Sequence, residues 1–302
     1  MKKILCIGHA SYDITLPLDH FPIENTKNRV STKVECGGGP ASNAAYLLAK
    51  WKMDTSFAGV VGTDYYGEKV EQELKEIGID LTYFEKSKIG KTTASYIIAN
   101  TAKGSRTIVT SRDENLHYQQ KHIQLKPDVI LVDGEEYEVS KRVLEENKEA
   151  ISILDAGHVR ESTVELGKFV TYLICSKDFA EEYTQISLEK NDRMSLIQVY
   201  DKLKADFQTN IVITLEDKGC FTKLEDYEII ASIPVKAVDS TGAGDIFHGA
   251  FTYFIANHYP LRQALQLANI TGAISVTRIG GRYSMPELEE VLEIGRKNAV
   301  LP

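Results

Sequence analysis

The chain has 302 residues, of which 43% are hydrophobic, so it is long enough for one large α/β domain or two small ones with a sizeable core. The formal net charge is −8 and Lys and Arg form no basic stripe, which argues against nucleic acid as a partner. No apolar run reaches transmembrane length, and the run from Ile4 to Ile7 is too short for a secretion signal, which argues against a membrane partner. The four cysteines are scattered singly, so we expect core residues in a reducing compartment and a cytoplasmic protein.

The first predicted strand runs from Lys3 to Gly8, a short apolar run that a glycine ends. Asp13 follows at the carboxyl end of that strand, which is the edge where open α/β sheets bind ligands. Its carboxylate can accept hydrogen bonds from two hydroxyl groups of a sugar, or it can cap its own turn. The residues alone leave both interpretations open.

A glycine turn then enters a predicted helix from Ala41 to Trp51. Gly38 and Gly39 allow a ligand to touch the backbone, and Asn43 either contacts that ligand or bonds the backbone of its own helix. The spacing nearly matches the dinucleotide fingerprint of dehydrogenases. We discount that class because Ser42 replaces the third glycine and no acidic strand end follows at the expected distance.

Strand and helix patterns alternate along the rest of the chain, which predicts a mostly parallel sheet covered by helices on both faces. The predicted strands after the first are 56–61, 129–132, 151–154, 170–175 and 211–214. Asp64 is expected to cap a helix that runs through Ile77. Two β-prone segments, about 14–35 and 91–110, predict a small accessory sheet. No repeat or low-complexity linker interrupts the chain, so we expect a single domain over residues 1–302.

The stretch from Asp239 to Asp245 reads DSTGAGD and opens a helix with apolar residues at helical spacing. Gly242, Ala243 and Gly244 let the backbone bend tightly, and the first amides of a helix lack intrahelical partners, so this turn is a candidate anion site. A carboxylate at Asp245 would repel a bound anion, unless it takes a proton from a nucleophile that attacks the anion. The plainer alternative is that it complements the helix dipole. Together the motif indicates phosphoryl transfer.

That stretch resembles the C-terminal signature of the ribokinase-like (pfkB) family of carbohydrate kinases, and Gly37-Gly38-Gly39-Pro40-Ala41-Ser42-Asn43 resembles its N-terminal signature. The two lie about two hundred residues apart in the order of the family, and the resemblance extends over essentially the whole chain. It implies a three-layer α/β sandwich with a mostly parallel sheet and a small β lid. It also implies transfer of a phosphoryl group from ATP, with Mg²⁺, to a sugar hydroxyl.

In the family pattern, Asp245 is the general base and the amides of residues 242–244 form the anion hole. The resemblance assigns the acceptor sugar to Asp13, Gly38, Gly39 and Asn43, and several members place a further substrate contact where Glu135 stands. The accessory sheet is a lid over the sugar in the family and frequently a dimer interface, which implies a homodimer. Arg106 on the second lid segment either adds positive charge to the site or is a solvated turn residue.

The resemblance also assigns the nucleotide. Thr214 to Gly219 resembles the nucleotide loop, although Glu216 replaces a usual glycine, and the segment 268–281 resembles the lining of the adenine pocket. Asn269 in that segment is a candidate adenine-side contact or a packed helix residue. In some relatives the loop at Asp239 and Thr241 holds a monovalent cation, and oxygen ligands suit K⁺.

Three departures from the family pattern affect specificity and magnesium binding. Tyr12 stands where asparagine is common. Ser176 and Phe179 replace an Asn and a Glu that help to organise Mg²⁺, so Asp178 or Glu181 would have to substitute. The Ser-Lys-Asp version resembles the ketohexokinase branch.

That similarity favours a ketohexose such as fructose as acceptor, with ribose and 2-keto-3-deoxygluconate also open. A nucleoside kinase of the same family and a non-catalytic sugar sensor are the alternative functions.

Overall fold

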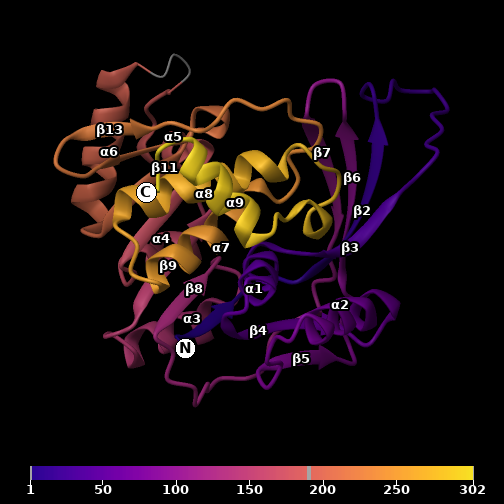
Figure 1. Cartoon of the computed structure of the whole chain (residues 1–302). Coiled ribbons are helices and arrows are strands. Elements are labelled where there is room, and N and C mark those ends of the chain that lie inside the picture. Colours follow the sequence, from indigo (N-terminus) through magenta and orange to yellow (C-terminus); the bar gives the residue numbers. More distant parts are fainter. Residues whose placement is uncertain (1, 189–191, 302) are drawn as a thin grey trace.

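The computed structural model describes residues 2–188 and 192–301. Within these residues the strands form two sheets, shown in Figure 1. The larger sheet pairs its strands in the order β13 (Tyr227–Ile230), β12 (Cys220–Lys223), β11 (Asn210–Thr214), β10 (Tyr172–Ser176), β9 (Ile151–Ala156), β8 (Val129–Val132), β1 (Lys3–Ile7), β4 (Asp54–Gly62) and β5 (Phe84–Ser87). The strands from β11 to β5 are parallel, whereas β12 and β13 are antiparallel. The expected mostly parallel sheet is confirmed.

Helices cover both faces of this sheet and make the outer two layers. One face carries α1 (Pro40–Lys50), α2 (Tyr65–Glu76), α7 (Ala243–Ala256), α8 (Leu261–Ser275) and α9 (Leu288–Lys297). The other face carries α3 (Tyr137–Glu146), α4 (Glu161–Gly167), α5 (Lys177–Thr184) and α6 (Arg193–Phe207). Two short 3₁₀ helices, η1 (Glu216–Lys218) and η2 (Arg282–Ser284), lie in loops.

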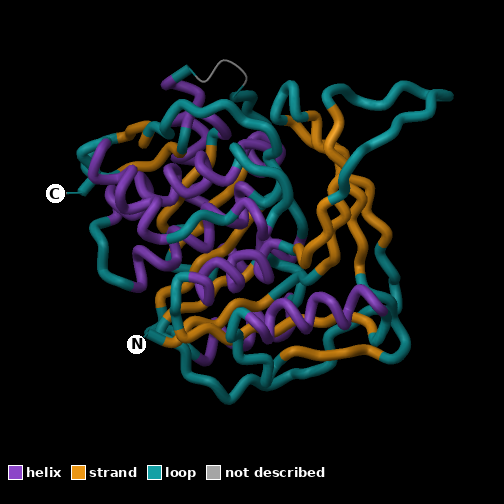
Figure 2. The backbone as a smooth tube through the Cα atoms, turned by 45° about the vertical axis from the view of Figure 1, so that its right-hand side comes forward, coloured by secondary structure: helices purple, strands orange, loops and turns teal. Residues whose placement is uncertain are grey.

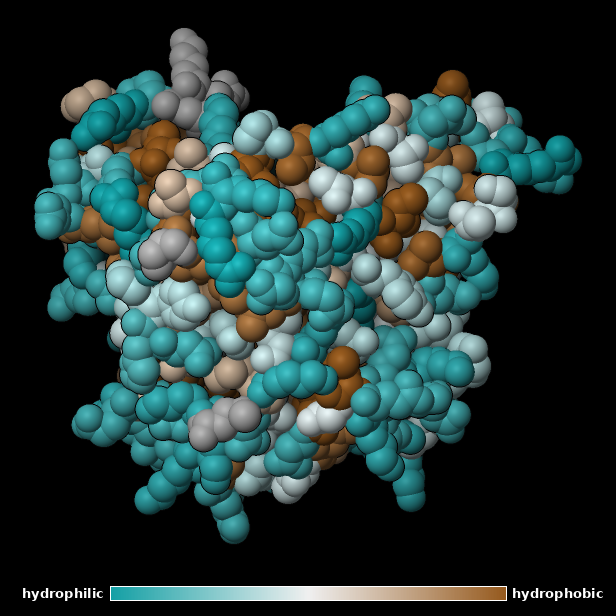
Figure 3. All heavy atoms as spheres, viewed as in Figure 1, coloured by the Kyte–Doolittle hydropathy of each residue, from teal (hydrophilic) through white to brown (hydrophobic). Residues whose placement is uncertain are grey.

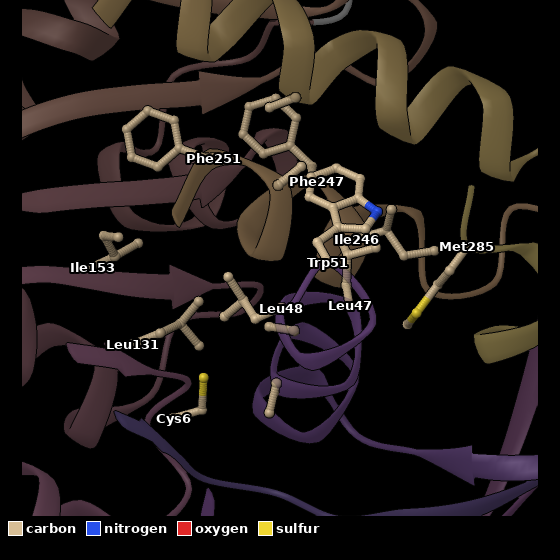
Figure 4. Packing of buried hydrophobic residues seen from close by; sticks show 14 of the residues in the cluster. Cys6, Leu47, Leu48, Trp51, Leu131, Ile153, Ile246, Phe247, Phe251 and Met285 are labelled. Atoms are coloured by element: carbon tan, nitrogen blue, oxygen red, sulfur yellow. The ribbon is translucent and has the colours of Figure 1, made fainter. Parts of the chain in front are cut away.

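The two-sided burial explains why the central strands read as continuous apolar runs. Successive side chains of a strand point to opposite faces. In β1, Cys6 packs into the core under α1 and α7, while its neighbour Ile7 packs into the core on the other face. Figure 4 shows the first of these cores, where Leu48 of α1 and Phe251 of α7 meet side chains from the sheet. This packing brings the beginnings of α1 and α7 to the same edge of the sheet.

The lid is a separate four-stranded sheet in the order β3 (Val34–Gly38), β2 (Ser11–Leu18), β6 (Thr93–Asn100) and β7 (Ser105–Ser111). Figure 2 shows it standing at the side of the main body. The predicted β lid is therefore present, although β2 begins three residues before the expected segment. As a result Asp13 lies within a lid strand rather than in a turn after β1. The lid thus contributes directly to the edge where ligands are expected.

Two local predictions are confirmed, the helix cap at Asp64 and the burial of the cysteines. The Asp64 side chain accepts a hydrogen bond from the Gly67 amide at 3.0 Å and caps α2. All four cysteines are buried and unpaired. Among the residues that the structure describes, no helix is both long and apolar enough to span a bilayer.

Candidate active site

Asp245 lies in the first turn of α7, where the helix begins after Gly242 in a left-handed conformation (φ 72°). One of its oxygens, Oδ2, accepts a hydrogen bond of 2.8 Å from Nδ2 of Asn43 on α1. Burial, and next the negative charge of Asp155, raise the pKa of Asp245 well above its ordinary value, which the bond from Asn43 partly offsets. A carboxylate with a raised pKa is suited to accept a proton near neutral pH.

The turn that precedes α7 lies beside Asn43 and Asp245. A Cβ would have room at both Gly242 and Gly244, and at Gly242 it would make ordinary contacts of 3.7 Å with Asn43 Nδ2 and 3.8 Å with Asp245 Oδ2. The positive φ of Gly242 is what favours glycine there. The amides that begin a helix have no intrahelical acceptor; that of Ala243 donates to the carbonyl of Ser240 at 3.4 Å. From the lid, Arg106 donates a hydrogen bond of 2.9 Å to the hydroxyl of Ser240. A cation therefore lies beside the predicted anion hole.

Asp13 and Gly38 face one another across paired lid strands. Asp13 is 6% exposed and accepts a hydrogen bond of 3.0 Å from Ser11. A Cβ at Gly38 would lie 2.2 Å from the Asp13 carboxylate, so this approach requires glycine. Burial raises the pKa of Asp13 to about 6. Gly39 caps α1 with φ 94°, and a Cβ there would lie 2.4 Å from the His9 carbonyl oxygen.

Glu135 follows β8 and accepts hydrogen bonds from two arginines. Arg112 reaches it from the end of β7 at 2.6 Å, and Arg160 reaches it from the loop before α4. Burial opposes ionisation of Glu135, but the bond from Arg112 and the charge of Arg160 prevail and lower its pKa to about 2. The neighbouring Asp133 is buried and accepts hydrogen bonds from the amides of His9 and Glu135. Glu135 is therefore an ionised group held at the sheet edge beside β1.

The candidate nucleotide residues gather around the ends of β11 and β12. Thr214 ends β11 and pairs with Cys220, and Gly219 has φ 98° with no room for a Cβ beside the Ile230 carbonyl oxygen. Asn269 on α8 is buried and donates a hydrogen bond of 2.8 Å to that same carbonyl. The Asn269 amide thus ties α8 to β13. Its contact with adenine stays a prediction. Glu216 is exposed.

Asp239 and Thr241 form a compact loop before α7. Asp239 is 1% exposed; its Oδ1 accepts hydrogen bonds from the amide and the hydroxyl of Thr241, at 2.9 and 2.6 Å. Its Oδ2 accepts a hydrogen bond of 2.9 Å from the amide of Gly280. All three of these donors to the buried carboxylate are neutral groups. A carboxylate in that setting suits a nearby cation.

The residues at the usual magnesium positions have other tasks. Ser176 caps α5 by accepting a hydrogen bond of 2.9 Å from the Phe179 amide, and Phe179 is buried in the core. Glu181 accepts a hydrogen bond from the amide of Leu188, whereas Asp178 is exposed in the first turn of α5. Over residues 2–188 and 192–301, no three His, Cys, Asp or Glu side chains converge as a metal site.

Sequence reasoning missed three buried groups beside the site. Asp155 is the second-last residue of β9, and its Oδ2 lies 3.1 Å from Nδ1 of His248 on α7. The same imidazole nitrogen lies 2.6 Å from the carbonyl oxygen of Gly244, within the predicted anion hole. Arg282, in η2, donates to the side chain of Asn43. Only the position of His248 within the motif at α7 offered a signal, because the other two are distant in sequence.

Three comparisons with known proteins agree with this arrangement. A model of the pfkB family carbohydrate kinases matches residues 1–288. The ribokinase of Lactococcus lactis is 26% identical, with 96% of each chain covered. The crystal structure of a putative ribokinase from Agrobacterium tumefaciens has a TM-score of 0.87 and 29% identity over 100% of this chain and 99% of that one. An Arabidopsis thaliana ribokinase, solved with ribose and ATP, has a TM-score of 0.80 and 22% identity over 97% and 98%.

The fold is that of the ribokinase-like α/β proteins. The chain belongs to the pfkB family of carbohydrate kinases. It is a phosphotransferase with an alcohol group as acceptor.

Proposed function

We propose that this protein transfers the γ-phosphoryl group of ATP to a hydroxyl group of a small sugar, with Asp245 as the general base. The observation that supports this most strongly is that Asn43, Asp245 and the glycine turn at Gly242 lie together where α7 begins, with Asn43 bonded to Asp245. A base and an anion hole at the same place are what phosphoryl transfer to a hydroxyl requires.

The proton and the charge move as follows. Asp245 takes the proton of the sugar hydroxyl as its oxygen attacks the γ-phosphorus, and the bond from that phosphorus to the bridging oxygen of ADP breaks. The amides of residues 242–244 stabilise the charge on the phosphoryl oxygens during transfer. The raised pKa of Asp245 makes it a competent base near neutral pH.

The acceptor would lie between the lid and the sheet edge. Asp13 and Asn43 would bind its hydroxyl groups. The backbone at Gly38 and Gly39 would contact the sugar directly, and Glu135 would supply one more contact. The acceptors that we propose are a ketohexose such as fructose, ribose, or 2-keto-3-deoxygluconate. Thr214, Gly219 and Asn269 would border the nucleotide.

Two cations belong to the proposal. Mg²⁺, when bound, neutralises charge on the ATP phosphates, and such sites commonly use only one or two carboxylates besides phosphates and water. The exposed carboxylate of Asp178 suits that need better than Glu181, which the Leu188 amide occupies. K⁺ would bind at the loop of Asp239 and Thr241, where three neutral donors bond to the buried carboxylate of Asp239.

We also propose that two copies associate through the lid. Every residue of β7 is exposed, including Ile108 at 45% and Val109 at 62%, and Tyr96 of the neighbouring strand β6 is also exposed. Figure 3 shows apolar atoms at the surface of the lid as well as in the main body. An unpaired edge strand with apolar residues is suited to pairing with a second copy.

The test is a coupled assay of ADP release over fructose, ribose, 2-keto-3-deoxygluconate, hexose phosphates and nucleosides, with Mg²⁺ and with or without K⁺. The proposal predicts turnover with one small sugar well above the ATPase rate without acceptor. Turnover only with nucleosides would show that the protein is a nucleoside kinase instead of a sugar kinase. Binding of a sugar without any ADP release would favour a non-catalytic sugar sensor.

A further inference from the structure

Arg282 is a buried cation at the base of the candidate site that the proposed reaction does not yet use. It is 4% exposed in η2, just after the glycine turn at 280–281. Its guanidinium donates three hydrogen bonds to two helices: Nη1 to Glu73 of α2 at 2.8 Å, and Nη2 to Ser42 and Nε to Oδ1 of Asn43 of α1 at 2.6 and 3.3 Å. Burial of a guanidinium is costly unless hydrogen bonds and a negative partner compensate for the lost water, and these three bonds supply that compensation.

The hydrogen bonds of Asn43 allow only one orientation of its side-chain amide. A guanidinium can only donate, and an ionised carboxylate can only accept. The amide of Asn43 lies between Arg282 on one side and Asp245 on the other. Its oxygen must therefore face Arg282, and its NH₂ group must face Asp245. If the amide turned over, its oxygen would lie against the carboxylate, and an NH₂ group would face the guanidinium.

The surroundings of Arg282 hold it in place. A Cβ at Gly37 would lie 2.1 Å from its Nη1, so β3 of the lid passes directly against the guanidinium. The amide of Gly37 donates to the same oxygen of Glu73 that Arg282 binds, at 2.9 Å. The Tyr46 ring lies beneath, with its centroid 4.9 Å from the guanidinium carbon. The lid, α2 and α1 are thus joined at this one side chain.

We propose that Arg282 is a positioning residue for phosphoryl transfer: it fixes the Asn43 amide so that its NH₂ group donates to Asp245 and aims that carboxylate at the acceptor hydroxyl. This inference rests on the proposed role of Asp245 as base. Arg282 touches neither reacting group in this arrangement and acts through Asn43.

The consequence is a defined pH dependence. A hydrogen bond to the charged form of a carboxylate lowers its pKa, so loss of the ordered Asn43 amide raises the pKa of Asp245. The other titratable groups that act on Asp245 are Asp155 near the end of β9, His248 on α7 and Arg106 on β7. None of these three is bonded to Arg282, so they act on wild type and variant alike.

The experiment compares wild type with Arg282→Met, and with Arg282→Met combined with Glu73→Gln, which avoids leaving the partly buried carboxylate of Glu73 without its cationic partner. Arg282→Lys is the conservative variant. The matched control is Arg296→Met, which removes an exposed arginine that pairs with Glu289 on α9. Each protein is titrated by ¹³C NMR of labelled aspartate carboxyls, with the Asp245 signal assigned by its absence from Asp245→Asn. The pH profile of kcat/KM is measured alongside.

We expect the Asp245 titration and the acidic limb of kcat/KM to move up together by about one pH unit in the methionine variants, less in Arg282→Lys, and not in Arg296→Met. With a base that titrates near pH 7, activity at neutral pH falls about fivefold and returns as the pH rises. An Asp245 titration that does not move in folded Arg282→Met, or in the double variant, overturns the inference. A wild type that phosphorylates nothing would overturn the proposed function instead, while the NMR titration would still decide the role of Arg282.

Discussion

Asp245→Asn should stabilise the ligand-free protein above neutral pH, although it removes the proposed base. Burial and the charge of Asp155 raise the pKa of Asp245 from 3.8 to about 7. The folded protein therefore holds a proton on this side chain over a pH range in which the unfolded chain has released it. Ionised Asp245 therefore destabilises the folded state. Asparagine cannot ionise, so the variant avoids this cost.

The sign and size follow from linkage. Below about pH 4 the side chain is neutral in both states and costs nothing. As pH rises toward 7 the unfolded chain ionises first, so folding stability falls, and above pH 7 the cost is complete. Each pKa unit corresponds to about 1.4 kcal/mol, so a rise of about three units costs up to about 4 kcal/mol. Asp245→Asn avoids this cost.

Urea unfolding of both proteins without ATP or sugar, near pH 5 and near pH 8.5, measures the difference. We expect the advantage of Asp245→Asn to be larger at the higher pH by a few kcal/mol. The matched control is Asp54→Asn, because Asp54 is an exposed carboxylate at the start of β4. An advantage that is equal at both pH values, or a variant that is less stable at both, would refute the assignment of a strained carboxylate.

Three further predictions follow from the same contacts. Asp155→Asn removes a negative charge that raises the pKa of Asp245, so the acidic limb of a kcat/KM pH profile should move to lower pH; a limb that stays in place contradicts the coupling. Gly38→Ala would put a Cβ 2.2 Å from the Asp13 carboxylate, so calorimetry should show sugar binding lost and ATP binding kept; normal sugar affinity would exclude Asp13 from the acceptor site. Burial raises the pKa of every cysteine thiol, so a thiol reagent should label none in the native protein and four in urea; rapid native labelling would contradict the packing of Cys6, Cys36, Cys175 and Cys220.

The elements that could be predicted from the sequence are those whose structure depends on neighbouring residues. The apolar run 129–132 matches β8 because a strand buried on both faces needs an apolar side chain at every position. Asp64 was identified as a cap from its position before a helical repeat, and caps act within one turn. The start of the lid was harder to place. The bend lies at Gly8, only His9 and Ala10 separate it from β2, and neither of those two is a glycine or proline that would mark the strand start.

In the candidate site too, only the part formed by neighbouring residues could be predicted from the sequence. Asp245 and its glycine turn are contiguous, so their chemistry could be inferred from the sequence. Arg282 and Asn43 are 239 residues apart, and their contact arises only when η2 packs against α1. Similarly, no local sequence pattern indicates that Arg112 and Arg160 both bond to Glu135. Such pairs depend on tertiary packing, which neither periodicity nor spacing encodes.

The most direct test of the account is the rate of ADP release with the best sugar acceptor, measured for wild type and Asp245→Asn at saturating ATP and sugar. Calorimetry in parallel establishes that both proteins bind the sugar. The account predicts a kcat lower by about 10²-fold or more in the variant with sugar affinity nearly unchanged, which is the loss expected for a general base. A variant that turns over within a few fold of wild type would contradict the role of Asp245 and with it the proposed mechanism.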